Sequence, residues 1–128
     1  MVDASMVNAE AGDRLVRLMD RAGEPPLAAL WVYSGDHERW RLWLVPRTGA
    51  RASQIAENYL KIAQLMNRNQ DELAGLDIGD IEFVDNQHPA IAGLSKALRI
   101  DGLGRVPMHA RLMGDYYLPD SIVMRMAG

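Results

Sequence analysis

The chain has 128 residues, of which 48% are hydrophobic, and a formal net charge of −3. This length predicts one domain spanning residues 1–128, and the apolar content is too high for a disordered chain. The sequence contains no cysteine, which excludes a disulfide framework, a cysteine nucleophile and thiolate metal sites. No apolar run approaches the roughly 18 residues of a membrane span, and the N-terminus lacks the basic start of a secretory signal. We therefore expect a cytoplasmic protein that does not contact a membrane.

The first third of the chain predicts a helix followed by a β-hairpin. Apolar residues recur at steps of three and four near residues 4–22, which is typical of an amphipathic helix that ends at Gly23. Residues 27–33 and 39–45 then read as two strands. The five residues between them suit a hairpin loop.

The rest of the chain predicts two helices, a short strand between them and two final strands. A helix is expected near 50–69, a strand at 80–84, and a helix near 89–99 with Pro89 in its first position. Strands follow at 106–113 and from either Tyr116 or Ser121 to Met126. Gly114-Asp115 favours a tight hairpin between these two, whereas Pro119-Asp120 favours a turn further along, so both connections remain open.

The element order is therefore α-β-β-α-β-α-β-β. This order predicts an α+β fold, with about three helices packed on a five-stranded, mixed but mainly antiparallel sheet. We expect nine apolar residues to form the core: Trp31, Leu42, Leu44, Ile55, Ile62, Ile81, Phe83, Leu94 and Leu98.

Charge is distributed unevenly along the sequence. Residues 39–51 contain four arginines and no acid, whereas residues 71–85 contain six acids and no base. The arginine-rich segment joins a strand to a helix N-terminus, where free N–H groups and the helix dipole favour an anion. The segment thus predicts a phosphate or nucleic-acid site, with ordinary helix capping as the alternative. The residues concerned are Arg47, Thr48, Gly49, Arg51 and Ser53.

Catalytic candidates are sparse. His88 begins a predicted helix, and Asp85 lies three residues before it, so the pair would suit a general base and its orienting carboxylate in a small hydrolase. His37 lies between Asp36 and Glu38 in the hairpin loop. No pair of histidines has metal-ligand spacing. We therefore expect no metal and no cofactor, and a protein that is more plausibly not an enzyme.

The strand at 39–45 carries apolar bulk on both faces. If all helices cover one face, then Arg41, Trp43 and Val45 form an open interface; if the N-terminal helix covers the other face, both tryptophans are core. The leading hypothesis is a non-catalytic interaction subunit that binds itself or another protein. Binding of a phosphate-containing ligand or nucleic acid is the alternative, and a hydrolase is third.

Overall fold

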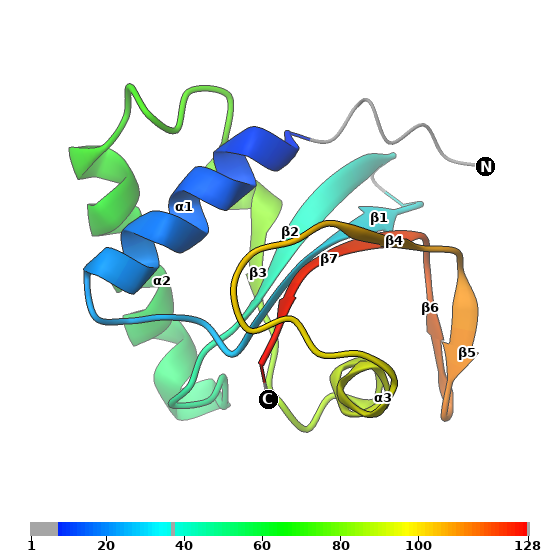
Figure 1. The fold of residues 1–128 in the computed structure, drawn as a ribbon. Helices are drawn as coiled ribbons and strands as arrows, with labels where there is room; N and C mark the ends of the chain where they lie inside the picture. Colours follow the sequence, from blue (N-terminus) through cyan, green and yellow to red (C-terminus); the bar gives the residue numbers. More distant parts are fainter. Residues whose placement is uncertain (1–7, 37, 128) are drawn as a thin grey trace.

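The computed structural model describes residues 8–36 and 38–127, and it confirms the predicted α+β fold (Figure 1). Three helices pack on a five-stranded sheet, and a separate two-stranded hairpin completes the domain. No helix among the described residues is long and apolar enough to cross a bilayer. The elements are α1 (Ala9–Arg21), β1 (Ala28–Ser34), β2 (Arg39–Val45), α2 (Ala52–Arg68), the 3-10 turn η2 (Ile78–Asp80), β3 (Ile81–Phe83), α3 (Pro89–Ala97), β4 (Val106–Met108), β5 (Arg111–Met113), β6 (Tyr116–Leu118) and β7 (Ser121–Met126).

The main sheet has the strand order β3-β2-β1-β7-β4. Only β2 and β3 run parallel; the other three pairs are antiparallel. Both connections that the sequence left open occur. Gly114, with a φ of +61°, turns β5 into β6, and residues 119–120 then lead β6 into β7. The predicted strand at 106–113 is thereby split into β4 and β5.

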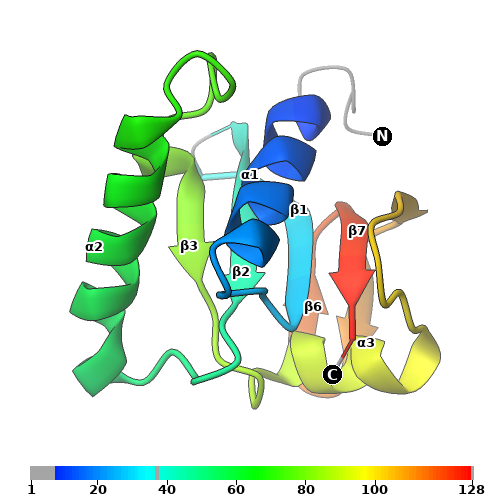
Figure 2. The ribbon, with the colours of Figure 1, turned by 60° about the vertical axis from the view of Figure 1, so that its left-hand side comes forward.

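One face of the main sheet is covered by α1 and α2 (Figures 1 and 2). The apolar side of α1 carries Leu15 and Val16, both fully buried against this face. Gly12 lets the helix approach closely, because a Cβ there would lie 2.8 Å from Nε1 of Trp31. Absence of a side chain at this position thus sets the distance between α1 and the sheet.

The opposite face is covered by α3 and the β5–β6 hairpin (Figure 1). Ile91 and Leu94 of α3 and Leu118 of the hairpin pack on residues of β1, β2 and β7. The protein therefore has two apolar cores separated by the sheet. Of the nine predicted core residues, all are buried except Ile55 and Leu98, which are half-buried at the margins of the two cores.

One ion pair fastens α1 to the C-terminal strand. The guanidinium of Arg125 donates to both carboxylate oxygens of Asp20, at 2.7 and 2.9 Å, and its Nε donates to the carbonyl of Gly102 at 2.9 Å. Only 8% of the Arg125 side chain is exposed. A bidentate pair of this kind fixes orientation as well as position, so it aligns α1 with β7.

The second core generates a stability prediction. Leu94 is fully buried beneath the sheet, so Leu94→Ala should cost about 2–5 kcal/mol, the usual cost of truncating a buried leucine. Leu112, which is 68% exposed on the hairpin, provides the control: Leu112→Ala should change stability by less than about 0.5 kcal/mol. Urea unfolding of both variants measures the difference, and equal effects would contradict the assigned packing of α3.

Candidate functional site

The expected open face of β2 does not exist in the described structure. Trp43 is only 6% exposed and Val45 is fully buried, because α3 and the hairpin cover them within one chain. Arg41 lies at the margin of this layer, with its Nη1 3.7 Å from Oε1 of Glu82. Trp43 and Val45 are therefore core residues, and the face predicted as an open interface is covered within the chain. The alternative, in which both tryptophans are core, is the arrangement found, although α3 rather than α1 provides the cover.

The arginine-rich loop before α2 holds a carboxylate, but that carboxylate belongs to the protein. Oδ1 of Asp85 accepts a hydrogen bond from the N–H of Ala50 at 3.1 Å, which lowers the pKa of Asp85. The N–H groups of Arg51 and Gly49 are also engaged, by Oε1 of Gln54 and the carbonyl of Pro46. Three consecutive backbone donors of this loop, those of Gly49, Ala50 and Arg51, thus already have internal partners.

The side chains of the predicted anion site point to different surroundings. Arg51 and Ser53 are exposed at the start of α2, and Gly49 adopts a φ of +97° that favours glycine. Arg47 and Thr48, by contrast, line a groove between α1 and α2. The loop therefore does not gather its polar side chains around one point.

His88 and Asp85 each accept a hydrogen bond from a nearby backbone N–H group. Nδ1 of His88 accepts a hydrogen bond from the N–H of Ala90 at 3.1 Å and so caps α3, while Oδ2 of Asp85 accepts from the N–H of Gln87. The imidazole lies edge-on between the rings of Trp43 and Tyr116, with centroid distances of 5.2 and 4.6 Å. Burial lowers the pKa of His88 and raises that of Tyr116. This cluster is a structural contact between β2, α3 and the hairpin.

His37 lies outside the described residues, and its neighbours Asp36 and Glu38 are exposed at the hairpin tip. Across residues 8–36 and 38–127, no three histidine or acidic side chains are grouped closely enough to hold a metal ion.

The least covered of the three helices is α2. This helix has 17 residues, yet only Ile62 is buried. Leu60 is 59% exposed, which is unusual for a leucine in the middle of a long helix. Figure 2 shows why: α2 forms one flank of the molecule beside β3, and no other element lies outside it.

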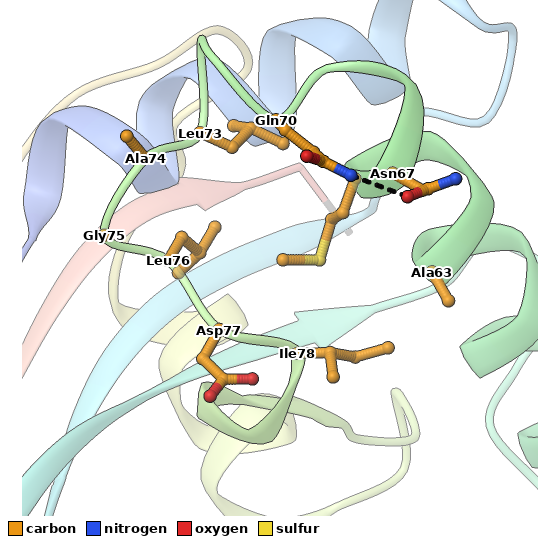
Figure 3. Close-up of a pocket in the computed structure, with 10 residues that line it drawn as sticks. Ala63, Asn67, Gln70, Leu73, Ala74, Gly75, Leu76, Asp77 and Ile78 are labelled. Carbon is orange, nitrogen blue, oxygen red and sulfur yellow. Dashed lines mark hydrogen bonds between the residues drawn. The ribbon is translucent and has the colours of Figure 1, made fainter.

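A groove of about 590 Å³ lies on this flank, between the C-terminal half of α2 and the loop that follows it (Figure 3). We call it the α2 groove. Leu73 and Leu76, which belong to the loop after α2, line one side of the groove, and Ile78 lines its lower end. Nε2 of Gln70 donates to Oδ1 of Asn67 at 2.7 Å along its rim. The full lining is Ala63, Met66, Asn67, Gln70, Leu73, Ala74, Gly75, Leu76, Asp77 and Ile78.

The loop beyond the C-terminal end of α2 is acidic, whereas Arg51 before the helix and Arg68 in its last turn are basic. Arg51 stands at the N-terminal end, and Asp71, Glu72 and Asp77 lie in the loop beyond the C-terminal end. All four are exposed, and none forms an ion pair with another residue in the described ranges. The flank therefore combines an exposed leucine, an apolar groove and unpaired charges of both signs.

Sequence reasoning missed this flank, although a signal was present. Ile55, Tyr59, Ile62 and Met66 form the stripe that faces the sheet, and Leu60 lies off that stripe by the geometry of the helix. A large apolar residue on the polar side of an amphipathic helix indicates a contact beyond the domain's own core. The groove itself depends on the loop 69–78, whose path the sequence pattern did not predict.

Comparison with known proteins offers no guide to this site: no protein family, no curated protein and no solved structure matches the chain.

The cap that His88 provides generates a pH prediction. Because the folded protein lowers the pKa of His88, the unfolded chain binds its proton more readily. Stability from this group is therefore present above the ordinary histidine pKa of about 6.5 and is lost as the pH falls below it. His88→Asn retains a capping side chain without the titration. The free energy of unfolding should then decline less between about pH 7.5 and pH 5 in the variant than in the wild type.

Urea unfolding at several pH values measures this difference. His109→Asn is the matched control, because His109 is exposed. If wild type and His88→Asn decline in parallel, the neutral capping role of His88 is wrong.

Proposed function

We propose that this protein is a non-catalytic interaction subunit that self-associates through α2, two copies packing their α2 flanks together about a two-fold axis. The observation that carries the proposal is the exposed Leu60, which lies one helical turn before Ala63 of the α2 groove. A projecting apolar side chain and a concave apolar surface lie on the same face of one helix. Two-fold symmetry requires such a face, because each copy must offer both halves of the contact.

The geometry of α2 fixes how the copies align. An antiparallel pair with its axis at the level of Lys61 and Ile62 places Leu60 of one copy opposite Ala63 of the other. Ala63 lines the groove and is small, so Leu60 enters beside it. The exposed outer surface one turn away carries Ala56, which also permits close approach of the helices.

Charge supports the same alignment. In an antiparallel pair, the start of one α2, with Arg51, comes to the level of the acidic loop that follows the other α2, which carries Asp71 and Glu72. The contact occurs twice because of the symmetry. Charges that lack partners within the chain would gain them between chains, which favours this register over a parallel one.

The alternatives have less support. For an anion or nucleic acid held by the loop at residues 47–53, three backbone donors of that loop are already bound to Asp85, Gln54 and Pro46. For a hydrolase, Nδ1 of His88 is occupied in capping α3. A partner protein of a different kind could use the same flank, so the first test is whether the protein binds itself.

The first test replaces the projecting leucine. Leu60→Glu should weaken the dimer by at least roughly a hundredfold, because two carboxylates would be brought together where water is excluded. Leu112→Glu is the matched control: Leu112 is similarly exposed, but on the hairpin at the other side of the sheet. Sedimentation equilibrium over a concentration series measures both. A wild type that stays monomeric, or a dimer weakened equally by both changes, would overturn the proposal.

The second test exchanges the charges. Arg51→Glu and Glu72→Arg should each weaken the dimer about tenfold, since two symmetric contacts change from attraction to repulsion, each worth about 0.5–1 kcal/mol. The double variant should recover most of the wild-type affinity. Added salt should reduce all these differences. Additive losses in the double variant would show that these residues do not face each other across the axis.

A further inference from the structure

The other side of α2 borders a second groove, between this helix and the end of α1. Its volume is about 410 Å³, within the range of roughly 300–1,000 Å³ that is typical of small-molecule sites. The side chains of Met19, Leu65 and Phe83 contribute to an apolar floor, together with Ile62 from the middle of α2. We call this cavity the α1–α2 groove.

The rim of the α1–α2 groove is strongly cationic. Arg47 comes from the loop before α2, and Lys61 and Arg68 come from α2 itself. Glu24 is the one acidic residue among the lining residues, and its Oε1 lies 3.3 Å from Nζ of Lys61. Arg47 and Arg68 form no ion pair with any described residue. Two arginines at one groove are therefore left without a counter-charge.

We propose that the α1–α2 groove binds a small amphipathic anion, an organic molecule with an apolar body and a phosphate head. The body lies on the floor formed by Met19, Leu65 and Phe83. The head lies at the cationic rim, where the two arginines without ion pairs, Arg47 just before α2 and Arg68 in its last turn, each offer charge-assisted donors. Arginine forks suit the oxygens of a phosphate, because they donate two parallel hydrogen bonds.

This site is distinct from the proposed dimer contact. The α1–α2 groove is lined by Asn58, Ile62 and Leu65 of α2, whereas the α2 groove is lined by Ala63, Met66 and Asn67. These two sets lie on different sides of the helix. Failure of one proposal therefore leaves the other standing, and a monomeric variant such as Leu60→Glu should still bind the anion.

The experiment titrates the protein with decyl phosphate below its micellar concentration, by calorimetry. One molecule should bind per chain, and shortening the tail to octyl should weaken binding roughly fourfold per methylene removed. Inorganic phosphate, which lacks the apolar body, should bind far more weakly than decyl phosphate. Decyltrimethylammonium, with the same tail and the opposite charge, should not bind. Equal binding of the two decyl compounds would overturn the proposal.

Variants of the rim locate the site. Arg47→Gln together with Arg68→Gln should weaken decyl phosphate binding by roughly tenfold or more, since hydrogen bonds to a charged head are lost. The matched control is Arg17→Gln together with Arg21→Gln, which removes the same charge from exposed positions on α1 outside the groove. All four arginines are exposed, so both double variants should fold. An equal loss in both would show a general charge effect and overturn the assignment to this groove.

Discussion

The architecture depends on the burial of both faces of the central strands. β1 and β2 carry large apolar side chains on each side, and their burial requires cover both above and below the sheet. Neither side is covered by one element alone. α1 and α2 together cover the face that carries Trp31 and Leu42, and α3 with the β5–β6 hairpin covers the face that carries Trp43. The three helices and the β5–β6 hairpin are therefore divided between two cores.

This division explains why α2 is left partly uncovered. α1 lies over the centre of the sheet, so α2 lies at the edge, over β3 (Figure 2). β3 has three residues and extends about 10 Å, whereas the 17 residues of α2 extend about 25 Å. Most of the helix therefore projects beyond the strand on which it rests. Grooves form on both of its sides, because the sheet is too narrow there to fill the space beneath it.

Hydrophobic periodicity was sufficient to predict the fold class and most of the core, because period and turn chemistry are local. The positions of Leu42, Ile62 and Leu94 followed directly from it. Hydrophobic periodicity did not predict which face of the sheet each helix covers. The periodicity of α3 shows that one side is apolar, but not which face of the sheet receives it, and the burial of Trp43 depends on that choice. The β5–β6 hairpin, which helps to cover Trp43, was predicted only as one of two possible turns. The sequence pattern did not indicate that it packs on the sheet.

Asp85 and His88, the pair that the sequence offered as catalytic candidates, both accept hydrogen bonds from backbone N–H groups. Asp85 and His88 lie close together in a short connection between β3 and α3, yet each serves a different helix start: Asp85 binds the N–H of Ala50 before α2, and His88 binds that of Ala90 in α3. Helix termini leave several N–H groups without partners, and nearby acceptors satisfy them. Such residues resemble a catalytic pair in sequence because the acceptor atoms of Asp and His that cap a helix are also the atoms that act in a general base. The exposed Leu60 and the arginines without ion pairs around α2 have no such internal role among the described residues, and the proposed binding rests on them.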